Sequence, residues 1–178
     1  MDPADQRLFF TFLNSHHSDE VPDWFANREQ FERWLTKERV AESDLIEVST
    51  EDVELARATR DALDALIDDR SPRNAAQLDA IAAASPIHVR FEAASSRLEP
   101  AARGIRGLSA RVLGIAHDAM RDGTWDRLSH CGNDTCQRAF LDQSKNRSRR
   151  WCDMDVCGTQ AKSRAYRARQ RELRERAR

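Results

Sequence analysis

The sequence lacks the features of a secreted or membrane-spanning protein. No run within its 178 residues is apolar enough to cross a bilayer, and the N-terminus lacks the basic-then-apolar layout of a signal peptide. We therefore expect a cytoplasmic protein with no membrane partner. Because thiols are kept reduced in that compartment, an even number of cysteines favours a metal site over disulfides.

Patterns typical of catalysis are also missing. The sequence shows no Ser-His-Asp arrangement, no glycine-rich phosphate loop and no paired carboxylates at a recognisable site. We therefore expect no enzyme, and an enzyme in the N-terminal part is only a third and weaker hypothesis. Internal repeats and long low-complexity linkers are absent as well, which favours a body packed close to the C-terminal module.

Charge is unevenly distributed along the chain, although the net charge is only −1. Residues 130–178 contain 13 Lys and Arg against 6 Asp and Glu, whereas the rest of the chain contains 16 against 24. The apolar fraction of 40% is still sufficient for a packed core. This split is typical of a basic nucleic-acid-binding or membrane-binding arm on an acidic body.

The spacing of apolar residues predicts a mainly helical N-terminal part. The expected helices are an early one ending near residue 14, then 27–39 behind a polar cap at Asn27, 50–70, a short one around 78–81, and 105–122 closed by Gly123. Apolar and polar residues alternate over 87–92, and Arg97-Leu98-Glu99 could form the second, returning strand. This alternation predicts one small β-hairpin near 87–99.

All the cysteines lie in one short segment, as two C-x4-C pairs separated by fifteen residues. Two loops with two thiolates each suit a tetrahedral ion, and Gly132 and Gly158 each follow a cysteine where a tight knuckle is needed. The alternatives are two disulfides or free thiols, and the neighbouring His130 could replace one ligand. We predict one structural Zn²⁺, because four thiolates leave no open position for water. The predicted ligands are Cys131, Cys136, Cys152 and Cys157.

Between the cysteine pairs, residues 139–142 and 149–152 are expected to form a hairpin around the polar turn 143–148. The residues after Cys157 favour a helix, since they contain no proline and no glycine beyond Gly158. The predicted fold class is therefore mainly α with a small β-hairpin. A helical N-terminal domain over 1–127 precedes a treble-clef-like four-cysteine zinc finger with a basic C-terminal helix over 128–178.

Basic residues gather in two places in this module. A stripe at steps of three and four follows the C-terminal helix: Arg164, Arg167, Arg171, Arg174 and Arg178. Further Lys and Arg crowd the turn, where no acidic residue lies between Asp142 and Asp153. Guanidinium groups pair well with phosphate and can read guanine edges in a major groove. The predicted nucleic-acid contacts are Lys145, Arg147, Arg149, Arg150, Lys162, Arg164, Arg167 and Arg171.

The alternative for the last helical turns is a solvated tail with internal ion pairs such as Arg171–Glu175 and Glu172–Arg176. That alternative does not account for the basic turn, which has no local acid to pair with. Membrane lipid or an acidic protein are the other candidate partners. Electrostatic contact with DNA should weaken steeply with salt.

The segment from Cys131 to Arg169 resembles the CGNR zinc-finger family of bacterial proteins. The matching residues are the first cysteine pair, Phe140, Asp142, Ser144, Asn146, Arg150-Trp151-Cys152, Met154, Cys157-Gly158, Lys162, Tyr166 and Arg169. The signature Cys-Gly-Asn-Arg is here Cys157-Gly158-Thr159-Gln160, which retains the metal ligand and loses an arginine.

Residues from about Leu8 to Arg127 resemble the ABATE domain that commonly precedes this finger. The matching features are Phe12-Leu13-Asn14, Trp34-Leu35, the hairpin from Val89 to Leu98, and the helix leading to Trp125. The two resemblances imply a stress-induced transcription regulator whose finger binds double-stranded DNA. Its N-terminal domain would sense a small-molecule effector or mediate assembly.

A lone finger with one basic helix buries little surface on DNA, so we expect a homodimer. The second hypothesis is a zinc-stabilised adaptor whose finger docks RNA or an acidic protein partner.

Overall fold

The computed structural model describes residues 1–16, 18, 22–40 and 48–176. Its elements, in chain order, are α1 (Pro3–Leu13), α2 (Arg28–Glu38), α3 (Thr50–Asp68), α4 (Pro72–Ala83), β1 (Ile87–Phe91), β2 (Ser96–Pro100), α5 (Gly104–Asp122), the short turn η1 (Trp125–Arg127), β3 (Leu128–His130), β4 (Ala139–Leu141), the π-helical turn η2 (Met154–Gly158) and α6 (Thr159–Arg176). The expectation of a mainly helical chain is confirmed. Within the described ranges, no helix combines the length and apolar character needed to cross a membrane.

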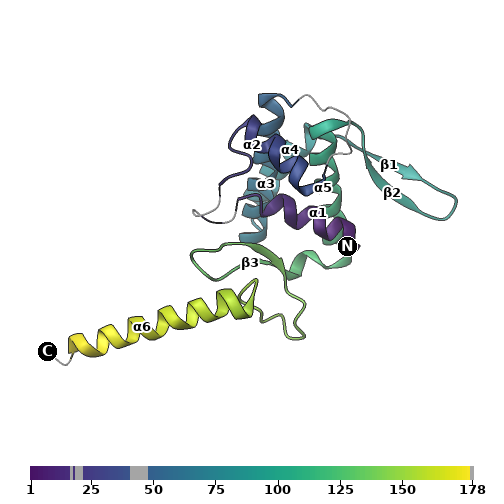
Figure 1. Cartoon of the computed structure of the whole chain (residues 1–178). Coiled ribbons are helices and arrows are strands. Elements are labelled where there is room, and N and C mark those ends of the chain that lie inside the picture. Colours follow the sequence, from purple (N-terminus) through teal and green to yellow (C-terminus); the bar gives the residue numbers. More distant parts are fainter. Residues whose placement is uncertain (17, 19–21, 41–47, 177–178) are drawn as a thin grey trace.

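Figure 1 shows α1 to α5 gathered into one body, from which two elements project in different directions. The antiparallel pair β1–β2 extends from one side, with Val89 opposite Leu98, and confirms the hairpin predicted near 87–99. The yellow helix α6 extends from the finger at the other end of the molecule. The molecule therefore has two projections, a β-hairpin on the body and a helix on the finger.

Helices begin and end at the residues whose side chains or backbone conformations suit those positions. The Asn27 side chain accepts a hydrogen bond from the Gln30 amide, and α2 starts at the next residue. Ser49 and Asp52 form a reciprocal cap at the start of α3. Gly123 closes α5 with a φ of 78°, a left-handed conformation that glycine adopts without strain.

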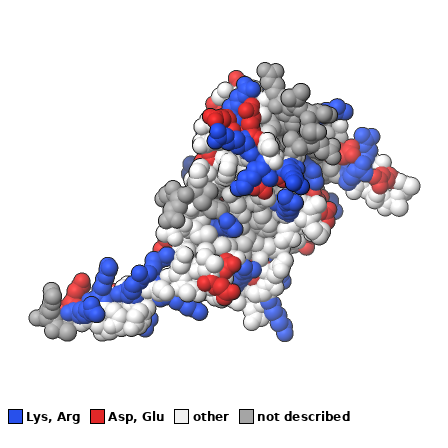
Figure 2. Space-filling model, in the orientation of Figure 1, with Lys and Arg blue, Asp and Glu red and all other residues white. Residues whose placement is uncertain are grey.

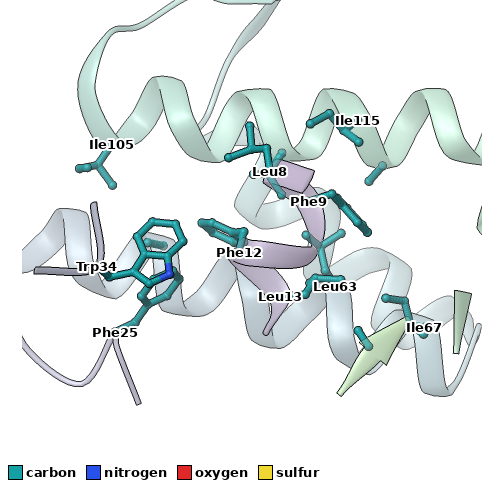
Figure 3. Close-up of a cluster of buried hydrophobic side chains, with 14 of the residues drawn as sticks. Leu8, Phe9, Phe12, Leu13, Phe25, Trp34, Leu63, Ile67, Ile105 and Ile115 are labelled. Atoms are coloured by element: carbon teal, nitrogen blue, oxygen red, sulfur yellow. The ribbon is translucent and has the colours of Figure 1, made fainter. Parts of the chain in front are cut away.

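The core of the body is largely aromatic and joins α1, α2 and α3 to α5. Phe12, Phe25 and Trp34 are buried and pack edge to face, with ring centroids 5.1 Å apart for Phe12–Phe25 and 4.9 Å for Phe25–Trp34. In Figure 3 these three rings meet beside Ile105 of α5, and Leu63 approaches from α3. Burying each such ring stabilises the fold by about 1.5–3 kcal/mol.

The charged side chain of Arg60 in α3 is also buried, at 3% exposure. Its guanidinium donates to the two carboxylate oxygens of Asp23 at 2.6 and 3.2 Å, and to the Ser15 hydroxyl at 3.2 Å. Burial by itself would raise the pKa of Asp23, but the hydrogen bonds from the Arg60 guanidinium and the Phe25 amide, together with the positive charge of Arg60, lower that pKa below its usual value. This pair fastens the segment after α1 to α3.

Polar contacts from the body hold the finger in place. The side-chain nitrogen of Asn14 donates to the Ala139 backbone carbonyl at 3.1 Å, and its side-chain oxygen accepts from the Ala139 backbone amide at 2.9 Å. The Asn14 side chain therefore pairs with the edge of β4. His130 of β3 lies between two carboxylates of α3, with Nδ1 2.6 Å from Asp68 and Nε2 3.1 Å from Asp64. The finger is therefore docked on the body, as the absence of a long linker predicts.

The strand pairing inside the finger differs from the prediction. β4 pairs with β3, with Phe140 opposite Ser129, and residues 149–152 form no strand. The predicted pairing of 139–142 with 149–152 is therefore wrong. The reason is Asp142, whose carboxylate accepts hydrogen bonds from the Ser144 and Arg149 amides and turns the chain away from β4.

Candidate metal centre and nucleic-acid interface

The four cysteine sulfurs form one cluster, all within 4.8 Å of one another. The Cys136 and Cys152 sulfurs are 3.6 Å apart, and those of Cys152 and Cys157 are 3.7 Å apart. These separations far exceed the roughly 2.05 Å of a disulfide, and the cysteines are free thiols. Four Zn–S bonds of about 2.3 Å in a tetrahedron place the sulfurs about 3.8 Å apart. The donor set and its spacing fit a single structural zinc, as predicted.

Both glycines next to cysteines lie where an added side chain would meet close neighbours. The Gly132 amide donates to the Arg150 carbonyl at 2.7 Å, and a Cβ on this glycine would lie 3.1 Å from that oxygen. A Cβ on Gly158 would lie 2.8 Å from the Met154 sulfur. A side chain at Gly132 would press on the backbone before the second knuckle, whereas one at Gly158 would meet the end of the flexible, exposed Met154 side chain.

The protonation of the thiols depends on burial and on their mutual contacts. Burial raises the pKa of Cys152, and hydrogen bonds with neighbouring thiols raise it further; burial also raises the pKa of Cys136. For Cys157, hydrogen bonding by Asn133 and the other thiols outweighs burial and lowers the pKa. The Cys152 amide donates to the Cys131 sulfur at 3.4 Å. A divalent cation would supply the charge that lets all four sulfurs ionise together.

Known families account for most of the chain. A family model for ABATE, described as "Putative stress-induced transcription regulator", matches residues 6–123, which is more than half of the chain. The chain belongs to the ABATE family. A second model, the CGNR zinc finger, matches residues 127–170 and covers all four cysteines. The comparison with curated proteins finds no match. Both predicted resemblances are confirmed, and the family description places this ABATE protein among regulators of transcription.

A buried asparagine in the first knuckle connects the zinc centre of this ABATE protein to α6. Asn133 is 1% exposed, and its side-chain oxygen accepts from the Thr135 amide and hydroxyl at 3.4 and 3.2 Å and from the Arg164 guanidinium. Its amide nitrogen donates to the Gln160 side chain at 3.1 Å. Gln160 stands where the family signature has arginine, so here that position braces the helix against the knuckle.

Replacing this asparagine, Asn133→Ala, is expected to loosen the finger while leaving one zinc bound per chain. Losing several buried hydrogen bonds destabilises a site by about 1–3 kcal/mol, so zinc transfer to a chelator should become about 5-fold faster or more. Stopped-flow measurement with a chromogenic chelator gives this rate. The exposed neighbour Asp134→Ala is the control, and equal rates for the two variants would show that Asn133 is no brace.

The eight predicted nucleic-acid contacts fall into two groups in the ABATE protein. Arg149 donates to the backbone carbonyls of Trp151 and Cys152 and lies over the Phe140 ring at 5.3 Å, so it stabilises the second knuckle. Arg164 is half-buried against Asn133. Arg149 is exposed on the turn, and so are the other six side chains on the turn and α6: Lys145, Arg147, Arg150, Lys162, Arg167 and Arg171.

The helix α6 carries its positive charge without internal neutralisation. Among the residues that the structure describes, no ion pair involves α6, so the alternative pairs Arg171–Glu175 and Glu172–Arg176 do not form. Figure 2 shows Lys and Arg side chains along the projecting helix. Arg178, the last member of the predicted stripe, lies outside the described residues.

Sequence reasoning missed the residues that position the finger. The side chains of Asn133 and Asn14 each make two or more hydrogen bonds in or to the finger, and neither residue belongs to a spacing pattern. His130, a possible substitute ligand from its position beside Cys131, has both ring nitrogens facing Asp64 and Asp68 in α3. Two carboxylates spaced four residues apart on one helix face are the signal that could have pointed to a docked histidine.

Proposed function

We propose that this protein regulates transcription by binding double-stranded DNA through the turn 143–150 and the exposed face of α6. The observation that carries the proposal is α6 itself, an 18-residue helix with no buried residue and a series of exposed arginines. An isolated helix of this kind, about 27 Å long, is marginally stable in water. Contact with phosphates would stabilise it and neutralise its charge.

The zinc centre would position both basic surfaces on one rigid unit. Cys157 lies in η2, which leads directly into α6, and Cys152 follows the basic turn. A major groove accommodates one α-helix, while basic side chains on a neighbouring loop can contact the phosphates that flank it. The exposed Arg167 and Arg171 on α6, and Lys145 and Arg147 on the turn, suit these two roles.

For the body we propose assembly and effector sensing rather than catalysis. In the finger, four sulfur ligands would leave the zinc no position for a reacting water, which supports a structural ion. A homodimer would double the small surface that one finger offers to DNA. Effector binding by the body and a cytoplasmic location stay predictions from the sequence.

Binding of a duplex labelled with a fluorophore, followed by anisotropy over a series of salt concentrations, tests the proposal. The double variant Arg167→Ala/Arg171→Ala should bind at least about 10-fold more weakly, and its salt slope should fall by about two if both arginines contact phosphates. The matched control removes two exposed arginines of the body, Arg33→Ala/Arg73→Ala, and should bind like the unmodified protein.

Three results would contradict DNA binding through α6. They are salt-independent binding, equal losses in the α6 and control variants, and no binding to duplex DNA at low salt. The same titration with single-stranded DNA and structured RNA tests the adaptor hypothesis. A clear preference for RNA over duplex would favour that adaptor instead.

A further inference from the structure

A line of uncharged side chains runs along one side of α6, from the end nearest the cysteine cluster towards its last turns. Its members follow one another at steps of four and three residues, which keeps them on one side of a helix with about 3.6 residues per turn. They are Thr159, Ser163, Tyr166, Gln170 and Leu173. Gln170 is half-buried and the other four are exposed, Tyr166 by 61%. We call this side of the helix the central line.

Basic side chains border the central line on both sides. One border has steps of seven residues and consists of Lys162, Arg169 and Arg176. The other border consists of Arg167, Arg171 and Arg174. All six side chains are exposed. The central line therefore lies between two rows of positive charge, each free to contact a row of phosphates.

The acidic residues of α6 lie on the side opposite the central line. That side has the same steps of four and three residues, and its members are Ala161, Ala165, Ala168, Glu172 and Glu175. The two glutamates are the only acidic residues in the sequence of α6. A helix that faces only solvent typically alternates charges of both signs along its faces. Here both carboxylates are on one side, which a nucleic acid would repel, and the other side is left to bind it.

Contacts with the finger fix the direction in which the central line points. Gln160 and Arg164, one turn apart on α6, both contact the buried Asn133, so the helix cannot rotate about its axis relative to the first knuckle. Figure 1 shows the rest of α6 extending away from the body, and the helix has no buried residue. The central line and both basic borders are therefore presented together by a fixed helix.

We propose that the central line faces the floor of a DNA major groove, where Tyr166 and Gln170 determine which base sequence is bound. The inference rests on the proposed function and names its specificity-determining residues. In this orientation the basic borders face the two phosphate backbones, and the glutamates point away from the DNA. A glutamine side chain can pair with N6 and N7 of adenine, and an aromatic ring can contact the methyl group of thymine. A major groove about 12 Å wide admits a helix, whereas that of A-form RNA is too narrow for side chains to read.

Selection from a pool of random duplexes by the full zinc-loaded chain, followed by anisotropy titrations, tests this proposal. The unmodified protein should enrich one sequence and bind it at least about 100-fold more tightly than a scrambled duplex. Gln170→Ala and Tyr166→Ala should each lower this ratio about 5-fold or more, because each removes a contact with a base. Both variants should keep the salt slope, since neither side chain contacts a phosphate. Arg169→Ala should instead weaken binding to both duplexes alike and lower the salt slope by about one.

The matched control is Glu172→Gln on the opposite side of α6, which should leave the ratio of the two affinities unchanged. The proposal is overturned if no sequence is enriched, if Gln170→Ala and Tyr166→Ala keep the full ratio, or if Glu172→Gln lowers it equally. Each of these results would leave duplex binding and its dependence on Arg167 and Arg171 intact. Absence of binding to any duplex at low salt would instead overturn the proposed function, and this inference with it.

Discussion

The variant Cys152→Ser is expected to lose its zinc and to unfold the finger while the body keeps its helices. Structural zinc contributes about 10–16 kcal/mol of binding free energy in small zinc-finger peptides at pH 7. The finger buries few apolar side chains of its own, chiefly those of Leu128, Ala139 and Phe140. Without the metal crosslink, those contacts cannot offset the conformational entropy of the two knuckles.

Zinc content by mass spectrometry and amide hydrogen exchange together measure this effect. Exchange should become fast over residues 128–158 and stay slow in α3 and α5. The matched control is His130→Gln, which changes the residue beside Cys131 that contacts Asp64 and Asp68. It should retain one zinc per chain. Stoichiometric zinc in Cys152→Ser, or its loss in His130→Gln, would contradict the assignment of the ligands.

Replacing the partner of the buried arginine, Asp23→Ala, is expected to destabilise the body by about 3–5 kcal/mol. Among the described residues, Arg60 would keep its guanidinium inside the fold with Ser15 and the exposed Asp61 as its hydrogen-bond partners. Urea unfolding followed by tryptophan fluorescence measures the loss. The control Asp61→Ala removes an exposed partner of the same arginine and should cost less than about 1 kcal/mol. Similar losses of unfolding free energy in both variants would show that the burial of the Arg60–Asp23 pair does not determine its contribution to stability.

The same pair gives the body a defined dependence on acid. The pKa of Asp23 is lower in the folded protein than its ordinary value of 3.8. Its contribution to stability is therefore complete above that value and is lost as the pH falls through the lower, folded pKa. Asp23→Ala should remove this part of the acid dependence. If the free energy of unfolding of the variant fell with pH below 3.8 as steeply as that of the unmodified protein, this role of Asp23 would be contradicted.

The parts of the fold that the sequence predicts well are those determined by local chemistry. The helix start behind Asn27, the stop at Gly123 and the alternation of the hairpin each depend on residues a few positions apart. The cysteine spacing likewise constrains the ligands to one cluster. In these cases the residues that decide the structure are neighbours in the chain.

The missed features depend on side-chain contacts that no spacing pattern indicates, some local and some between distant segments. β4 pairs with β3 because Asp142 turns the following chain, and its other edge pairs with Asn14, which lies 125 residues earlier. The charge pattern also could not show that Arg149 and Arg164 bind oxygen atoms of the knuckles. A guanidinium can bind a carbonyl or an amide oxygen as well as phosphate, and only tertiary structure distinguishes these partners.

X-ray absorption at the zinc edge of the purified full chain tests the central claim most directly. The account predicts one zinc per chain with four sulfur neighbours at about 2.3 Å and no nitrogen or oxygen ligand. A first shell containing nitrogen or oxygen, or the absence of stoichiometric zinc, would contradict a finger held by Cys131, Cys136, Cys152 and Cys157.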